Sequence, residues 1–342
     1  MSYGLKKKKK MYRILISSKV EGLAKDYRDN LFGKRRKDFI KPLILLQKQL
    51  DDINAQKGRR YNNWTVYANY LTNIITHYDD LLDLKPSQFG TYHTNYFNVP
   101  KRILTDKKWR KTKIGRVSFA DTVVKLMRYE DVRSKEIIPY FEKLGIRTCV
   151  YCNSQYVPTV HFEKGKVVGG YQLDHNWPKS EFPFLCTSFF NLYPVCSNCN
   201  LWKLDNRAKF VLYSDDSTQI EPFKFSLTKV SIIKYMLYQN SEELDIVFDS
   251  SDKTLRDNHE QLFHTDEYYR SFRDVAEELV WKSKTRNDVY KKQMIQSFLK
   301  LFPRRKADIN RFLYGFYFSP NDTHQRPLTK FQQDIAKQLG IV

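Results

Sequence analysis

The chain has 342 residues, of which 41% are hydrophobic and 15% aromatic, so it can bury a sizeable core and is not a disordered polar chain. It contains no apolar run of 18 residues and no secretory leader, so we expect a cytoplasmic protein without a membrane span. The formal net charge is +21, and residues 1–140 hold 31 Lys and Arg against 14 Asp and Glu, which favours nucleic acid as a partner over a merely solvated basic face.

The N-terminal region, residues 1–145, is basic and has mainly helical patterns. The lysine run at residues 6–10 resembles a mobile arm. Apolar residues recurring at three- and four-residue steps, together with segments rich in Tyr and Leu, predict helices at residues 21–55, 63–84 and 119–144. Gly145 is a suitable C-cap for the last of them, and residues 91–116 are expected to form loops or short extended pieces.

Residues 146–210 differ in composition, because Cys, Gly, Pro, Asn and aromatic residues dominate. Loose alternation over residues 154–162, a turn at 163–166 and a second strand at 167–173 predict a β-hairpin that ends at Asp174 and His175. A helix is expected to begin near Ser197. It would present Leu201, Leu204 and Ala208 to the hairpin.

The C-terminal region, residues 211–342, is again mostly helical. Helices are predicted at residues 227–239, 266–283, 286–302 and 328–339. Residues 241–252 are acidic and are expected to form a connection. The predicted fold class is therefore α+β: a mainly helical protein with a small strand-and-helix core embedded between the regions 1–145 and 211–342.

Four of the five cysteines form two CxxC pairs, Cys149 with Cys152 and Cys196 with Cys199. Zinc prefers four tetrahedral ligands, and two CxxC turns supply four thiolates. The sequence therefore predicts one structural zinc ion, whereas Cys186 is expected to be a small apolar core residue. The segment between the two pairs is longer than a compact zinc ribbon needs, so it is expected to carry a further function.

That segment contains residue types suited to phosphodiester hydrolysis. His175 can serve as a general base because an imidazole titrates near neutral pH. Asp174 and Asn200 offer the hard oxygen atoms that Mg²⁺ or Mn²⁺ prefers, and the amide of Asn191 could orient His175 or its loop. Each of these residues, taken singly, also has an ordinary structural interpretation as a turn, cap or surface residue.

Basic residues near this cluster are candidates for contacts with nucleic acid. In a helix that begins near Ser197, Asn200, Lys203 and Arg207 would lie on one face. Lys179 follows the predicted base on a loop and is an equally plausible solvated lysine. The sequence therefore predicts Lys179, Lys203 and Arg207 as phosphate-contacting residues.

Taken together, these motifs resemble the HNH endonuclease superfamily. The resemblance is carried by Cys149-Val-Tyr-Cys152, Asp174-His175 and Asn191-Leu-x-Pro-x-Cys-x-x-Cys-Asn200-x-x-Lys203. It implies a ββα-metal core, a hairpin and a helix around one divalent ion, with His175 as the base. It also implies that Asp174 and Asn200 bind the ion, that Asn191 fills the middle motif position, and that the four cysteines bind zinc. The third motif residue is Asn200 where the family name has a histidine, so the chain has the HNN variant; the match spans under a fifth of the chain.

Two classes of function remain open. The first is a metal-dependent endonuclease, with DNA preferred over RNA as substrate. The alternative is a non-catalytic, zinc-stabilised nucleic-acid-binding module. Residues 326–335 are also similar to the ends of HNH nuclease subunits from Septu-type and retron-linked antiphage systems, which implies a partner-gated effector beside an ATPase protein encoded in the same operon.

Overall fold

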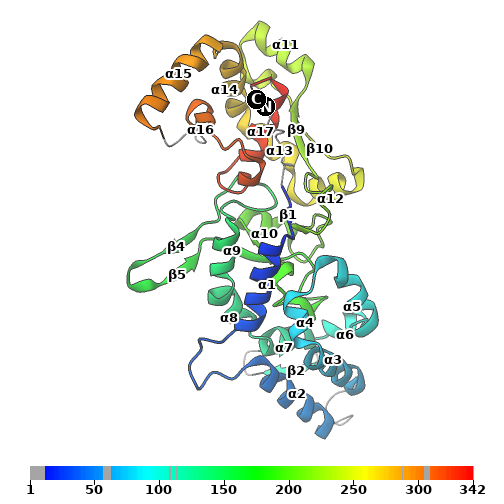
Figure 1. Cartoon of the computed structure of the whole chain (residues 1–342). Helices are drawn as coiled ribbons and strands as arrows, with labels where there is room; N and C mark the ends of the chain where they lie inside the picture. Colours follow the sequence, from blue (N-terminus) through cyan, green and yellow to red (C-terminus); the bar gives the residue numbers. More distant parts are fainter. Residues whose placement is uncertain are drawn as a thin grey trace. The chain divides into compact units, whose positions relative to one another are not determined.

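The structure is a computed structural model that describes residues 12–56, 63–107, 109–112, 115–286, 288–303 and 309–341. The predicted lysine arm at residues 6–10 lies outside these ranges. The described chain is mainly helical, with short strands in two-stranded pairings (Figure 1). None of its described helices combines the length and the apolar character that crossing a bilayer requires.

The chain folds into two compact units, each built from separate segments. One unit, here called the pocket unit, combines Ile16–Leu144 with Pro158–Tyr213. The other, the terminal unit, combines the described residues before Ile16 with Gly145–Val157 and the chain from Ser214 onward. The division into three consecutive regions expected from the sequence, residues 1–145, 146–210 and 211–342, stays a prediction.

Helices make up most of the pocket unit. They are α1 (Ser18–Asn30), α2 (Pro42–Gln56), α3 (Trp64–Thr76), α4 (Tyr78–Asp83), α5 (Phe89–Tyr96), α6 (Lys101–Leu104), α7 (Phe119–Leu126), α8 (Tyr129–Asp131), α9 (Ile138–Leu144) and α10 (Ser197–Lys203). The strands are β2 (Arg110–Thr112), β3 (Gly115–Val117), β4 (Thr159–His161), β5 (Val167–Gly169), β6 (Gln172–His175) and β7 (Leu192–Val195). Two-residue strands, β1 (Ile14–Leu15) and β8 (Tyr213–Ser214), lie at segment ends.

The helices predicted in the N-terminal region are shorter than expected. The segment 21–55 contains two helices, α1 and α2, because Phe32 between them has a φ of 61°, a left-handed conformation that a helix cannot include. The segment 119–144 is likewise interrupted at Arg128, whose φ is 59°. A π-helical turn, η3 (Val132–Glu136), follows before α9. Gly145, with a φ of 74°, ends α9 as predicted.

Two further segments differ from expectation. The segment 63–84 is divided into α3 and α4 at His77. The helix α5 forms where loops were expected. Its first residue, Phe89, is buried with its ring 5.7 Å from that of Trp177, so a contact distant in sequence stabilises this short helix.

The expected hairpin is present, but Asp174 and His175 do not belong to it. Strands β4 and β5 pair antiparallel with Thr159 opposite Gly169. Asp174 and His175 lie on the separate strand β6, which pairs antiparallel with β7. The strand pair before α10 is therefore β6–β7, which is joined by a long loop, residues 176–191, rather than by a tight turn.

This loop is buried beneath helices, which explains how so long a connection keeps one conformation. Tyr27 of α1 donates a hydrogen bond to the carbonyl of Thr187 (2.8 Å), and its ring lies 5.6 Å from that of Phe189. Phe184 stacks on Phe97 with ring centroids 4.1 Å apart. The helical part of the pocket unit therefore acts as the support for the loop between β6 and β7.

The terminal unit is also mainly helical. Its elements are α11 (Lys229–Tyr238), α12 (Lys253–Phe263), α13 (Thr265–Tyr269), α14 (Arg273–Thr285), α15 (Asp288–Leu301), α16 (Ile309–Tyr314), α17 (Thr329–Gln338), β9 (Lys224–Leu227) and β10 (Ile246–Asp249). The expected connection at 241–252 contains β10, which pairs with β9, and α12 was not predicted. The closing helix was predicted correctly as α17, which packs against β9.

Candidate active site and cysteine cluster

Apart from the first CxxC pair and Arg207, the site residues expected from the sequence lie on β6, on the segment from β6 to α10 and on α10. Register pairs Asp174 with Tyr193 and His175 with Leu192 across β6 and β7. The chain then continues directly from β7 into α10, which begins at Ser197 as predicted. Two antiparallel strands followed by a helix therefore hold Asp174, His175 and Asn200 in one pocket.

His175 is buried, and its hydrogen bond determines the tautomer. Its Nε2 lies 2.9 Å from the carbonyl oxygen of Cys186, which can only accept, so Nε2 carries the proton in the neutral ring. Nδ1 is then the basic nitrogen. Burial, together with the charges of Lys179 and Lys203, lowers the pKa of His175 to about 3, so the ring is neutral at pH 7.

Tyr129 holds the imidazole from the helical side of the pocket. Its ring centroid lies 4.8 Å from that of His175, and its hydroxyl donates a hydrogen bond to the carbonyl of Leu173 (3.1 Å). Burial raises the pKa of Tyr129, so the phenol stays protonated and remains a donor. Sequence reasoning did not identify this residue, because no local pattern links it to β6.

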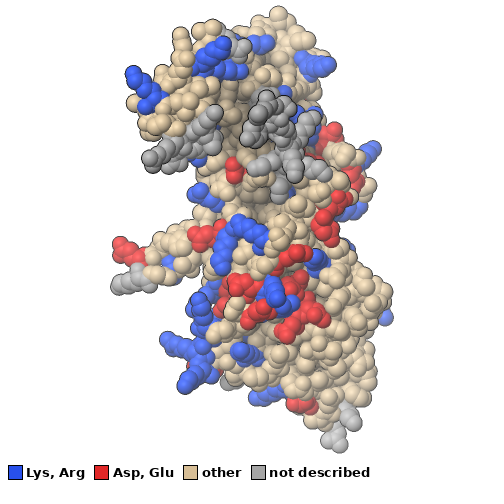
Figure 2. All heavy atoms as spheres, viewed as in Figure 1, with Lys and Arg blue, Asp and Glu red and all other residues tan. Residues whose placement is uncertain are grey.

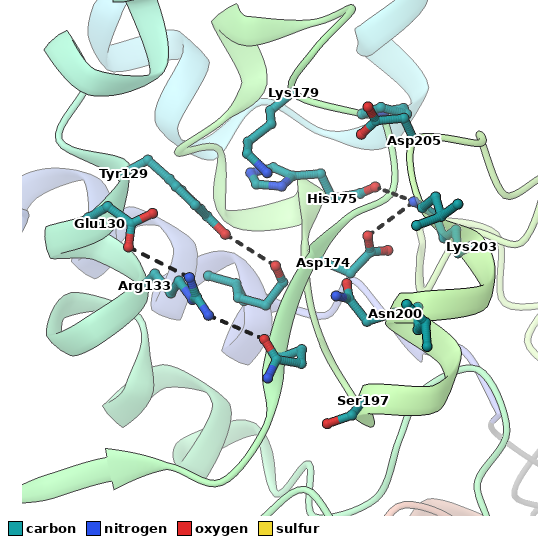
Figure 3. Close-up of a pocket in the computed structure, with 15 residues that line it drawn as sticks. Tyr129, Glu130, Arg133, Asp174, His175, Lys179, Ser197, Asn200, Lys203 and Asp205 are labelled. Carbon is teal, nitrogen blue, oxygen red and sulfur yellow. Dashed lines mark hydrogen bonds and ion pairs between the residues drawn. The ribbon is translucent and has the colours of Figure 1, made fainter. Parts of the chain in front are cut away.

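Asp174 is engaged by Lys203. The Lys203 ammonium, which is fully buried, donates to Oδ1 of Asp174 (3.1 Å) and to the carbonyl of His175 (2.9 Å). Asn200 lies on α10 beside the carboxylate of Asp174, as Figure 3 shows. The predicted contact of Lys203 with phosphate stays a prediction, since its charge is directed at Asp174 in this structure.

Arg207 does not share a helical face with Asn200, which corrects the expectation from spacing. The helix α10 ends at Lys203, and Leu204 has a φ of 49°. The guanidinium of Arg207 lies 3.6 Å from the ring centroid of Trp177 in a cation–π contact. Leu204 is exposed, and so is Leu201, so neither packs on a hairpin, whereas Ala208 is buried.

Asn191 holds the loop that contains the partner of His175. Its Oδ1 accepts from the backbone N–H of Trp177 (2.8 Å), and its Nδ2 donates to the carbonyls of Trp177 and Leu185 (both 3.1 Å). The residue is completely buried and does not line the pocket. The amide thus joins two parts of the loop between β6 and β7, and its predicted role in orienting His175 or that loop stays a prediction.

The pocket itself has a volume of about 490 Å³. Its walls include Asp174, His175, Lys179, Asn200 and Lys203 (Figure 3). The ammonium of Lys179 lies 5.4 Å from the ring centroid of Tyr129, and its positive charge contributes to the lowered pKa of His175. The pocket thus combines a neutral base with carboxylates, an amide and cations.

Two CxxC turns meet in a four-cysteine cluster. The ligand sulfur atoms of Cys149, Cys152, Cys196 and Cys199 all lie within 4.8 Å of one another, and all four residues are buried. The N–H of Cys199 points at Sγ of Cys196 (3.5 Å), and the hydroxyl of Ser154 donates to Sγ of Cys152 (3.1 Å). This donor set could hold one tetrahedral metal ion.

Two asparagines that the sequence did not single out support the site region. Asn153 has a φ of 53°, and its side chain bonds Thr148, the carbonyl of Thr323 and the N–H of Lys330. It therefore connects the first CxxC turn to the start of α17. Asn176, directly after His175, donates to the carbonyls of Ala208 and Phe210. The signal that distinguishes these asparagines is their burial beside a motif. Burial is a tertiary property, so the sequence did not reveal them.

Comparison of the chain with models of protein families, with curated proteins and with solved structures gives no match.

Proposed function

We propose that the chain is a metal-dependent nuclease of the HNH type that hydrolyses phosphodiester bonds in nucleic acid. The observation that carries the proposal is the hydrogen bond from Nε2 of His175 to the carbonyl of Cys186. It leaves Nδ1 as an unprotonated acceptor in a pocket that also contains Asp174 and Asn200. A neutral base beside two oxygen donors is what metal-assisted hydrolysis requires.

The donor set fits a divalent cation such as Mg²⁺ or Mn²⁺. Asp174 supplies a carboxylate and Asn200 an amide oxygen, both hard donors. The ion pair with Lys203 involves Oδ1, and a carboxylate has about four acceptor positions, so one ammonium does not exhaust its capacity. A bound ion would stabilise negative charge on the leaving oxygen.

The protein's own residues account for the proton transfer. His175 is neutral at pH 7 and accepts a proton from water at Nδ1. An anionic phosphodiester in the pocket raises the pKa of His175, because a nearby negative charge stabilises the imidazolium. The hydrogen bond to Cys186 and the contact with Tyr129 keep the ring in one orientation throughout.

The proposal includes a structural zinc ion on Cys149, Cys152, Cys196 and Cys199. Four buried thiols within 4.8 Å of one another suit a tetrahedral zinc better than oxygen-preferring cations. The cluster contains Cys196, the N-cap of α10, so the metal would anchor the start of the helix that carries Asn200.

The test is cleavage of plasmid DNA, single-stranded DNA and RNA with Mg²⁺, Mn²⁺ or EDTA. We expect His175→Ala to lower the rate about 10²–10⁴-fold at any metal concentration. Asp174→Ala and Asn200→Ala should also lower it, but with partial recovery in excess Mn²⁺. The matched control is His161→Ala, because His161 is exposed, bonds Glu142 and does not line the pocket. Full-rate cleavage by His175→Ala would contradict the assignment of the base.

A non-catalytic, zinc-stabilised nucleic-acid-binding module is the second candidate. The observation that favours it is the buried ion pair of Lys203 with Asp174, which supplies that carboxylate with a cation from the protein itself. This alternative predicts binding without cleavage under every metal condition. It also predicts equal binding by the wild type and by Asp174→Ala.

The gated form of the nuclease proposal, an antiphage effector beside an ATPase partner, rests on the sequence resemblance alone. It predicts that purified protein is inert and that cleavage appears when the protein of the neighbouring ATPase gene is added. His175→Ala must remain inert in that mixture. Cleavage by the isolated chain at full rate would remove the need for a partner.

A further inference from the structure

A second pocket continues from the candidate site along the hairpin β4–β5. The hairpin packs against η3 and α9, and the pocket at this junction has a volume of about 820 Å³. Its wall shares Glu130, Arg133 and Leu173 with the wall of the candidate site. The two pockets are therefore adjacent, and we call the second one the basic groove, defined by Arg35, Arg133, Lys135, Lys166 and Val168.

The basic groove has an excess of positive charge. Four of its lining residues are Arg or Lys and one, Glu130, is acidic. Arg35 is neutralised by Asp131 and Glu136, at 3.2 and 2.7 Å. Lys135 and Lys166, by contrast, are exposed and form no ion pair with any described residue. Figure 2 shows Lys and Arg side chains gathered on the surface below the projecting hairpin.

An exposed aromatic ring stands at the edge of the groove. Phe162, directly after β4, is 54% exposed, and its N–H donates to the carbonyl of Lys166 across the turn (2.8 Å). The Lys166 ammonium lies 5.9 Å from the centroid of the Phe162 ring. Aromatic rings interleaved with cations bind single strands, because phosphates meet the cations and unpaired bases stack on the rings. A duplex keeps its base faces stacked internally, so it cannot use such a ring.

We infer that the basic groove is the path of a single-stranded polynucleotide that extends from the candidate site. Lys135 and Lys166 contact its phosphates, and Phe162 stacks on one of its bases. This inference rests on the proposed function, because it takes the candidate site as the place where the strand is cut. The inference itself concerns binding of the strand and not its hydrolysis. It assigns the hairpin β4–β5 to substrate binding, although the hairpin contributes no residue to the candidate site.

The experiment measures binding of a fluorescent single strand of about 16 nucleotides. Binding is measured in EDTA at several salt concentrations, with His175→Ala as the parent chain so that no strand is cut. The first variant is Lys135→Glu with Lys166→Glu, and the second is Phe162→Ala. The matched control is Lys25→Glu with Lys48→Glu, two exposed lysines of α1 and α2 that lie outside both pockets and change the net charge equally.

We expect the double variant Lys135→Glu with Lys166→Glu to weaken binding at least about tenfold. It should also make the slope of log affinity against log salt concentration shallower by about 1.4, since each of two phosphate contacts contributes about 0.7. Phe162→Ala should weaken binding about tenfold without changing the slope. The control pair should change neither quantity by as much. Thermal unfolding of each variant shows whether its fold is retained, and the two independent variants prevent one misfolded chain from deciding the outcome.

Three results would overturn the inference: no strand binding by the parent, equal weakening by the control pair, or equal or tighter binding of a duplex of the same length. These outcomes are separate from the failure of the proposed function. A chain that binds through the groove but never cleaves contradicts only the nuclease. If the wild type cleaves but the groove variants bind the strand as tightly as the parent, only the inference about the basic groove is contradicted.

Discussion

Two asparagines of the same motif differ in role because they differ in burial and partners. The amide of Asn191 bonds backbone groups of Trp177 and of Leu185, which directly precedes Cys186, the residue whose carbonyl holds His175. Asn200 is only partly buried and lines the pocket beside Asp174. Asn191 therefore acts through the geometry of the loop, and Asn200 is the one of the two that can reach a ligand.

Asn191→Ala should lower the cleavage rate about 10²-fold while single-strand binding and zinc content stay unchanged. The change removes the Asn191 bonds of the buried Trp177 N–H and carbonyl, at a cost of about 1–3 kcal/mol for each group. The Leu185 carbonyl keeps its bond from the N–H of Ser188, but losing Asn191 there displaces the adjacent Cys186 carbonyl from His175. The control is Asn198→Ala, since Asn198 is exposed on α10. If Asn191→Ala cleaves at the wild-type rate, the loop does not position the base.

At the scale of elements, the region of the candidate site is a short helix attached to a strand pair. The helix α10 has only seven residues, and isolated helices of that length are unstable in water. Its N-cap is Cys196, and its last residue, Lys203, is tied to β6 through Asp174 and His175. Fixing both ends is what lets so short a helix present Asn200 at a defined position.

Cys196→Ser should therefore remove bound zinc and disorder α10, because metal-binding energy of about 10–16 kcal/mol in small knuckles is also folding energy. Elemental analysis should give about one zinc per chain for the wild type and much less for the variant, with a lower melting temperature. The control is Cys186→Ala, a buried cysteine outside the cluster. Folded wild-type protein without zinc would contradict the proposal.

At the scale of the whole molecule, buried histidines couple stability to pH. Burial lowers the pKa of His259 to about 3 and also lowers the pKa of His324. His259 is enclosed by the rings of Phe223, Phe248 and Phe263, and its Nδ1 lies 3.1 Å from the hydroxyl of Thr265. In the unfolded chain a histidine titrates near 6.5, so only the unfolded state gains a proton as the pH falls below that value.

As the pH falls from about 6.5 towards the pKa of the folded state, each such histidine should therefore lower the free energy of unfolding by about 1.4 kcal/mol per pH unit. Urea midpoints at pH 7.5 and 5 should show this loss for the wild type and a smaller loss for His259→Gln, even if that variant is less stable at pH 7.5. His161→Gln, an exposed histidine, should keep the wild-type dependence. An unchanged dependence in His259→Gln would mean that the buried ring does not titrate as argued.

The sequence by itself determined the features that depend on short spacing. Two CxxC pairs predicted the cysteine cluster, the chain after Cys196 predicted the start of α10, and apolar periodicity predicted the helical character and α17. These predictions succeed because cap chemistry, turn geometry and helical period act over a few residues.

Only the tertiary structure decided the partners of the polar residues. Spacing placed Lys203 and Arg207 on one face, yet Lys203 is directed to Asp174 and Arg207 to Trp177. It also assigned Asp174 and His175 to the hairpin that contains β4, whereas they pair with β7. The physical reason is that these contacts join residues far apart in sequence, where burial and packing, and not local propensity, select among many possible partners.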